Sequence, residues 1–434
     1  MAAEPSARAV ALALLVAVLD RRSPLDDALE AQRDLKLLTP RDRGFARLLA
    51  ATTLRRLGQL DGAIDSCLRH TLDADRPIAR HILRLGAVQL LFLDTPPHAA
   101  VDGAVTLADD GPARGLKGLI NAVLRRLARE GRALVAAQDA ARLNLPGWIW
   151  ESWTTSYGEP QTRAIAAVLM QDPPLDLTMR DDQGDGAAGW APRLDGRVLP
   201  TGTVRRLGGG DVEQLPGFAD GAWWVQDVAA ALPARLLGAV AGRRVADLCA
   251  APGGKTAQLA AAGARVIAVD RAARRLDRVR ANLARLRLKA EIVAADAATW
   301  QADAPCDAVL LDAPCSATGA SRRHPDVLHL KRPEDVVRLT ALQDRLLDNA
   351  VRQLKPGGLL IYCTCSLEAA EGPARIARLL SGGAPVRRKP VDSAEFAGLE
   401  GLITPDGDLR TLPCHLAEQG GMDGFYAARL TRLD

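Results

Sequence analysis

The first third of the chain repeats apolar side chains at intervals of three and four residues, the spacing of one helix face. Few β-branched runs interrupt this pattern between Ser6 and Asp139. Prolines at positions 24, 40, 77 and 96–97 divide it at points where a helix starts or stops. The pattern predicts an all-α helical domain, to which we assign residues 1–140.

The pattern changes after Gly221, where short apolar runs alternate with helical spacing. Such alternation predicts parallel βαβ units, and we assign residues 221–434 to an α/β Rossmann-like domain. The strand candidates are RRVADL, RVIAVD, AEIVAAD, DAVLLDAP and GGLLIYCTC, whose last polar residues are Asp247, Asp270, Asp296, Asp312 and Cys365. Ligands of open α/β sheets bind beyond the carboxyl ends of the strands, so we expect these side chains to converge on one crevice.

Residues 141–220 fit neither pattern and predict a linker with a small α+β subdomain. The segment begins with three closely spaced tryptophans at 148, 150 and 153 and continues into a stretch rich in Gly and Asp. Clustered tryptophans can stack on bases, but packing in a core or between domains is their commoner use. The predicted fold class is therefore multidomain, all-α followed by α/β.

Composition indicates a globular protein with enough apolar material for about three domains, with 434 residues of which 48% are hydrophobic. The apolar run AVALALLVAVL lacks the flanks of a signal peptide and predicts a buried helix, and no run reaches the ~20 apolar residues of a membrane span. The seven cysteines form an odd set without zinc spacing, which favours free thiols, a cytoplasmic location and no metal site.

Net charge is only +4, so any contact with nucleic acid has to be local. One local patch lies between Pro112 and Arg142, where seven Arg or Lys residues face only two acids. This patch is compatible with RNA binding and equally with a solvated helix face.

The stretch DLCAAPGGKT, from Asp247 to Thr256, predicts a strand, a tight turn and a helix start. Gly253 and Gly254 remove side chains where a ligand approaches the backbone. Asp270 follows Asp247 by 23 residues, the separation at which an acid on the next strand reaches a ribose. The turn has neither the dinucleotide nor the P-loop glycine pattern. It indicates a nucleoside cofactor site, the alternative being a turn without a ligand.

Two cysteines stand at the predicted exits of strands beside small residues, Cys315 in DAPCSATG and Cys365 in IYCTCSL. Such positions leave a sulfur approachable and able to act as a thiolate. A thiolate that adds to carbon 6 of cytosine makes carbon 5 nucleophilic towards a methyl sulfonium donor. The other cysteines among apolar neighbours fit the role of small core residues, namely Cys67, Cys249, Cys306 and Cys363.

The motifs DLCAAPGGKT, DAPCSATG and TCSL together resemble those of the RNA 5-methylcytosine methyltransferases that use S-adenosyl-L-methionine. The segments RDRGFARLLATTLRRLGQLD and KGLINAVLRRLARE resemble the RNA-binding helical domain of the NusB type. Together they resemble the family of bacterial 16S ribosomal RNA cytosine-5 methyltransferases over nearly the whole chain.

This resemblance implies Cys365 as the nucleophile, Cys315 as the residue that assists product release, and Asp312 as a carboxyl facing both donor and base. It implies that the cofactor is held by Cys249, Ala250, Ala251, Pro252, Gly253, Gly254, Lys255, Asp270, Asp296 and Asp312. DNA cytosine methyltransferases have the opposite arrangement, with the nucleophile in the PC motif. The implied partner is RNA, namely 16S ribosomal RNA, and we expect a monomer that binds neither a metal nor a membrane.

Three departures from the family pattern are visible: Leu177-Thr178-Met179-Arg180 in place of Leu-Arg-Val-Asn, EAAEG after TCSL, and Ala317 in place of a glycine. Only the first concerns an expected RNA contact, and neither of the others is expected to touch the thiols. SRRHPD, which follows Cys315, is a candidate for holding the RNA backbone, and His324 within it a weaker candidate for a base. Two alternatives remain: a methyltransferase acting on transfer RNA or another RNA, and a non-catalytic RNA-binding assembly factor.

Overall fold

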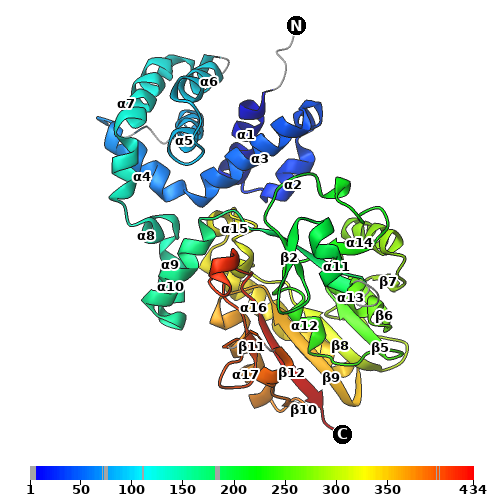
Figure 1. Cartoon of the computed structure of the whole chain (residues 1–434). Coiled ribbons are helices and arrows are strands. Elements are labelled where there is room, and N and C mark those ends of the chain that lie inside the picture. The colour runs from blue at the N-terminus through cyan, green and yellow to red at the C-terminus, as the bar shows by residue number, and fades with distance from the viewer. Residues whose placement is uncertain are drawn as a thin grey trace. The chain divides into compact units, whose positions relative to one another are not determined.

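The computed structural model describes residues 6–70, 72, 77–109, 112–180, 186–396, 398–399 and 401–434. The chain forms two compact units, and each contains two separate pieces of sequence. The first unit consists of residues 1–171 and 321–332, and the second of residues 172–320 and 333–434 (Figure 1). Part of the Gly- and Asp-rich stretch, residues 181–185, lies outside the described residues.

The first unit is helical, as the apolar spacing predicts. The prolines mark helix starts: Pro24 precedes α2, and α3, α5 and α6 begin at Pro40, Pro77 and Pro97. The helices are α1 Ala7–Leu15, α2 Leu25–Ala31, α3 Pro40–Arg55, α4 Leu57–Cys67, α5 Pro77–Leu91, α6 Pro97–Asp109, α7 Lys117–Ala136, α8 Ala140–Asn144, α9 Gly147–Tyr157 and α10 Glu159–Leu169. The expected first buried helix is α1, which continues as a π-helical turn.

A segment from far along the chain completes the helical unit. Residues 321–332, which carry the short helix α15 (Val327–Leu330), pack among its helices. A carboxylate oxygen of Asp326 accepts the Leu25 N–H at 3.0 Å, and the His329 ring lies 2.8 Å from the Leu54 carbonyl. Burial lowers the pKa of His329, so its neutral ring fits this donor role.

The second unit is built on an eight-stranded sheet in the order β10-β12-β9-β8-β5-β6-β7, with β11 paired to β12. Strands β5 to β9 pair in parallel, whereas β12 is antiparallel to β9. The strands are β5 Arg244–Leu248, β6 Arg265–Asp270, β7 Glu291–Ala294, β8 Cys306–Asp312, β9 Leu354–Thr364, β10 Val386–Arg388, β11 Leu409–Arg410 and β12 Tyr426–Arg432. The five strands expected of a Rossmann-like domain are therefore present, and DGFYAARL supplies β12.

Helices cover both faces of this sheet, so strand residues are buried alternately on either side. One face packs on α12 (Leu232–Arg235) and α13 (Gly254–Ala261), and the other on α16 (Pro333–Arg352) and α17 (Pro373–Ser381). Beside β6 and β7 runs α14 (Ala273–Leu286). The strand order reverses between β5 and β8, and such a switch point leaves a crevice beyond the carboxyl ends of the strands.

A small antiparallel sheet, β2-β3-β1-β4, forms the rest of the second unit together with α11 (Gly186–Arg193). Its strands are β1 Leu175–Met179, β2 Gly196–Val198, β3 Val204–Arg206 and β4 Trp223–Val225. At its centre Arg205 and Asp176 form a fully buried two-pronged ion pair at 2.7 Å. The α+β subdomain expected before residue 220 corresponds to this sheet, while α8 to α10 group with the helical unit.

No helix within the described ranges is both long and apolar enough to cross a bilayer.

Candidate active site

The loop after β5 has a backbone that only small residues tolerate. Cys249 has φ 61° and Gly253 has φ 99°, both in the left-handed region, and α13 begins directly after Gly253. A Cβ atom on Gly253 would lie 3.1 Å from the Val279 side chain, so α14 approaches the loop closely. Four of the loop residues are small, so its backbone is accessible to a ligand beside the N-terminus of α13.

Asp270, the last residue of β6, connects the loop to the neighbouring strand. One of its carboxylate oxygens accepts the Ala251 N–H at 3.2 Å, and the other accepts the Ala272 N–H at 2.9 Å. The guanidinium of Arg275 donates to the Ala251 carbonyl at 2.6 Å and lies 3.8 Å from Asp270. These contacts fix the loop against β6, and the sequence alone gave no sign of the Arg275 contact.

Lys255 and Asp312 join the glycine loop to the end of β8. The Lys255 ammonium lies 2.7 Å from Asp312 Oδ2 and 5.0 Å from the centre of the Phe425 ring. Burial lowers the pKa of Lys255, but Asp312 together with Cys363 and Cys365 outweighs burial, and the net pKa is raised. Lys255 is therefore a buried cation held at the switch point.

The two thiols predicted at strand exits meet beyond β8 and β9. The sulfur atoms of Cys315 and Cys365 are 3.5 Å apart, and both side chains are half-buried. The hydrogen bond with Cys365, together with burial, raises the pKa of Cys315 well above its ordinary value. The raised pKa favours the protonated form of Cys315 at neutral pH.

The other predicted residues take different positions. Burial raises the pKa of Cys249 and Cys363, which suits inert thiols, and Cys363 donates to Asp312 Oδ1 at 3.6 Å. Asp296 lies two residues beyond the end of β7, is exposed, and accepts the Ala298 N–H at 2.9 Å. Its side chain caps a turn, and no contact links it to the glycine loop within the described part of the chain.

The segment SRRHPD belongs to the helical unit and not to the thiol site. Arg322 is fully buried and its carbonyl accepts a hydrogen bond from Arg55 at 3.2 Å. His324 lies 3.4 Å from a carboxylate oxygen of Asp26. Burial of Arg322 removes it from contact with an RNA backbone, and the His324 partner argues for a structural role.

A buried glutamate, Glu371, was not predicted from the sequence, because EAAEG was expected to lie away from the thiols. Its carboxylate contacts the residues that directly follow Cys315 and Cys365, namely Ser316 and Ser366. The only signal in the sequence was an acid six residues after Cys365 in a segment of small residues.

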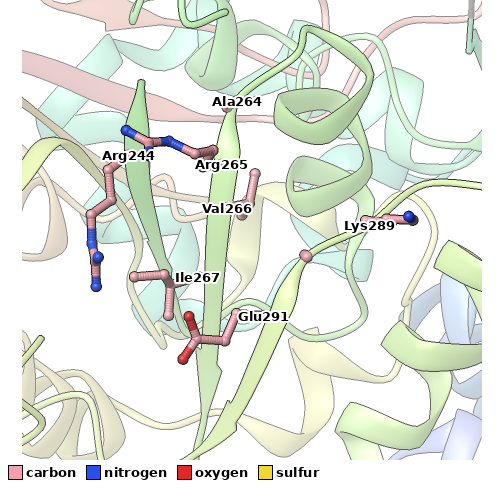
Figure 2. A pocket seen from close by; sticks show the side chains of 8 residues that line it. Arg244, Ala264, Arg265, Val266, Ile267, Lys289 and Glu291 are labelled. Atoms are coloured by element: carbon pink, nitrogen blue, oxygen red, sulfur yellow. The ribbon is translucent and has the colours of Figure 1, made fainter. Parts of the chain in front are cut away.

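A basic pocket of about 380 Å³ lies at the other end of the sheet (Figure 2). It is lined by the amino ends of β5, β6 and β7 and contains Arg244, Arg265, Lys289 and Glu291. The crevice with the thiols lies beyond the carboxyl ends, so this pocket is separate from it. No cluster of three or more potential metal ligands occurs among the residues with described positions.

A Rossmann-like sheet with this glycine loop, joined to a helical unit, is the architecture of a methyltransferase with an N-terminal helical domain, and each of the two parts matches a family model. The family model described as 16S rRNA methyltransferase RsmB/F matches residues 234–431, and that of the NusB family matches residues 5–129. The chain belongs to the RsmB/F family of 16S rRNA methyltransferases.

Individual relatives agree with the family models over nearly the full length. Ribosomal RNA small subunit methyltransferase B of Pseudomonas putida is 39% identical, with 98% of each chain covered. The Vibrio cholerae protein of the same name is 35% identical, covering 98% of this chain and 97% of its own. A methyltransferase homolog from Pyrococcus horikoshii has a similar structure, with a TM-score of 0.56 and 25% identity over 67% of this chain and 97% of its own.

Proposed function

We propose that this protein transfers a methyl group from S-adenosyl-L-methionine to carbon 5 of a cytosine in 16S ribosomal RNA. The observation that carries the proposal is the pair of sulfurs 3.5 Å apart beyond β8 and β9, next to the glycine loop. A methyltransferase that acts on a nitrogen or oxygen nucleophile has no need of a thiol, because its target already carries a lone pair. Two adjacent thiols fit a reaction in which one sulfur adds to the base and the other takes part when that sulfur is expelled.

The residues of the loop fit the cofactor. A Cβ on Gly254 would meet nothing closer than 3.6 Å, and the surrounding side chains from Cys249 to Pro252 are small. Backbone groups of this loop and Lys255 would hold the methionine part, and Asp270, the acid at the tip of β6, would hold the ribose. Asp296 would contribute near the adenine from the turn after β7. The bound cofactor supplies the methyl group as a sulfonium electrophile.

Cys365 would begin the reaction as a thiolate that adds to carbon 6 of the cytosine. The carbon–sulfur bond forms and the electron pair of the 5,6 double bond moves to carbon 5, which becomes nucleophilic. Asp312 would contact the exocyclic amine or ring nitrogen of a flipped cytosine, and Lys255, bound to it at 2.7 Å, would keep that carboxylate in place.

Cys315 would complete the reaction as a thiolate, accepting the proton from carbon 5 while the bond between carbon 6 and Cys365 breaks and Cys365 leaves as a thiolate. In the free protein its hydrogen bond with Cys365 does most to raise the pKa of Cys315. When Cys365 is bound to the base as a thioether, that sulfur carries no charge or proton to share. Loss of that hydrogen bond lowers the pKa of Cys315, so Cys315 would give up its own proton to water and become the proton acceptor only after the adduct has formed.

The helical unit would supply the RNA contact. Arg125 and Arg129 are exposed on α7, and Arg126 beside them is paired with Glu130 at 2.8 Å. Exposed guanidinium groups on one helix suit phosphates, which position an RNA without reading its sequence. We expect the protein to act in the cytoplasm as a monomer.

The proposal is tested by incubating the purified protein with cofactor and either 16S ribosomal RNA or transfer RNA, followed by bisulfite sequencing. One protected cytosine in the ribosomal RNA and none in the transfer RNA is the expected result. Protection in transfer RNA alone would reassign the substrate, and methyl incorporation without any protected cytosine would overturn the cytosine chemistry. Complete absence of methyl transfer would favour an assembly factor.

A further inference from the structure

A single buried carboxylate binds both thiol loops. Glu371 ends a short 3-10 helix, Ala369–Glu371, and its side chain is fully buried. Its Oε1 accepts the Ser316 N–H at 2.9 Å, while Oε2 accepts the Ser316 hydroxyl at 2.5 Å and the Ser366 hydroxyl at 2.6 Å. Ser316 directly follows Cys315 and Ser366 directly follows Cys365.

The carboxylate is itself held from two sides by the core. Gln343, a buried residue of α16, donates to Glu371 Oε1 at 3.0 Å and to the Pro314 carbonyl at 2.9 Å. The Tyr362 hydroxyl donates to the Glu371 carbonyl at 2.7 Å. Glu371 is thus fixed to a sheet strand and a covering helix, and it transmits that position to both loops.

Burial of such a group needs a reason, because an unpaired carboxylate in a core is costly. Among the residues with described positions Glu371 has no ion-pair partner, and its oxygens are satisfied by hydroxyl, amide and backbone donors. An apolar side chain would fill the space at less cost but could not bind the two serines. The two loops come from different strands, β8 and β9, so an acceptor shared between them fixes one relative to the other.

We infer that Glu371 is a positioning residue, which sets the separation of the Cys315 and Cys365 sulfurs by binding the serine that follows each. The inference rests on the proposed function for its catalytic meaning, because in that function the two thiols act one after the other on the same cytosine. A displacement of one reacting group by about 1 Å can cost on the order of a hundredfold in rate. The negative charge of Glu371 also contributes to the raised pKa of Cys315.

The test compares Glu371→Gln with the parent in two measurements. The first is the rate at which diamide oxidises Cys315 and Cys365 to a disulfide, identified by mass spectrometry of the linked peptides. The second is the single-turnover rate of covalent adduct formation on RNA that carries 5-fluorocytosine. We expect both rates to fall by about tenfold or more, since an amide nitrogen cannot accept the serine hydroxyls. Cofactor affinity is expected to stay within about twofold, because Glu371 has no hydrogen bond to the glycine loop among the contacts of the described residues.

Glu368→Gln is the matched control, because Glu368 is also buried and lies three residues earlier, but its carboxylate accepts from Thr318 at 3.3 Å. We expect less than about a threefold change for this variant. If Glu371→Gln does not fold, the double variant with Ser316→Ala and Ser366→Ala removes both hydroxyl bonds to Glu371, leaves the Ser316 N–H bond, and should lower both rates. Disulfide and adduct formation at the parent rates in either variant would overturn the inference. Absence of adducts in the parent itself would count against the proposed function. The rates of disulfide formation would still test whether Glu371 positions the two thiols.

Discussion

The sulfur atoms of Cys315 and Cys365 lie 3.5 Å apart although 50 residues separate them in the chain. Their strands are parallel neighbours, and Asp312 at the end of β8 pairs in register with Cys363 near the end of β9. Cys315 lies three residues after the end of β8 and Cys365 directly follows β9, so the pairing of the two strands brings both cysteines together. The Gly319 N–H bonds to the Cys365 carbonyl at 3.0 Å and joins the two loops a second time.

Replacement of the proposed nucleophile separates chemistry from binding. We expect Cys365→Ala to abolish transfer of radiolabelled methyl groups to RNA, because no thiolate then activates carbon 5. Calorimetry should find cofactor affinity unchanged, since the sulfur belongs to a different loop. The double variant Cys315→Ala Cys365→Ala gives the background rate. Methyl transfer by Cys365→Ala above that background would contradict the assignment of Cys365 as the nucleophile.

Replacement of the second thiol should stop the reaction at a later point. In Cys315→Ala the adduct forms but the proton at carbon 5 has no nearby acceptor, so protein accumulates on the RNA. A slower band on a denaturing gel, removed by ribonuclease, is the measurement. Turnover at the parent rate without such a band would remove this role from Cys315.

Ala317 carries backbone strain that a glycine would relieve. It has φ 60°, in the left-handed region, where a side chain costs about 1–2 kcal/mol. We expect Ala317→Gly to raise the free energy of unfolding in urea by about 1 kcal/mol, reduced by the greater freedom of glycine in the unfolded chain. Ala313→Gly, at a buried neighbour without a positive φ, is the control and should destabilise the protein.

Asp247 makes stability depend on pH in the opposite sense to a salt-bridged acid. Burial raises the pKa of Asp247 to about 7, whereas the pKa of an aspartate in the unfolded chain is about 4. The folded state therefore retains a proton that the unfolded state has lost. Its contribution to stability is complete below about pH 4 and is lost as the pH rises to about 7. Between pH 5 and pH 7 we expect urea unfolding of Asp247→Asn to change less with pH than that of the parent, and parallel pH curves would contradict this.

Exposed arginines of α7 should govern the salt dependence of RNA binding. For the double variant Arg125→Ala Arg129→Ala we expect weaker binding, and a slope of log affinity against log salt that is smaller by about 1.5. Filter binding at several salt concentrations measures this. The control is Arg378→Ala, because that guanidinium is already paired with Asp348 at 2.6 Å. Equal slopes for all three proteins would assign RNA binding to another surface.

Much of the fold follows from local patterns in the sequence. Prolines at helix starts and polar residues at strand ends are short-range signals, and the predicted strands β5 to β9 appear where the apolar runs lie. The cysteines at strand exits were identifiable because adjacent parallel strands end at the same edge of a sheet. These features depend on residues close together in sequence or on a general rule of sheet topology.

Contacts between distant side chains were not predictable in this way. Glu371 binds Ser316, which lies 55 residues away in the chain, and the composition of EAAEG does not predict that partner. Arg322 appeared to be a surface residue because it stands in a basic run, yet tertiary packing buries it. The positive φ of Ala317 likewise depends on loop geometry that a single sequence does not reveal.

The insertion of residues 321–332 into the helical unit means that neither half of the protein is a continuous stretch of sequence. A protease cut or gene break after Gln171 would release a front half without its α15 segment, leaving the Leu25 N–H and the Leu54 carbonyl without Asp326 and His329. Transfer of this helical domain onto another enzyme therefore requires two grafts, one of which begins six residues after Cys315.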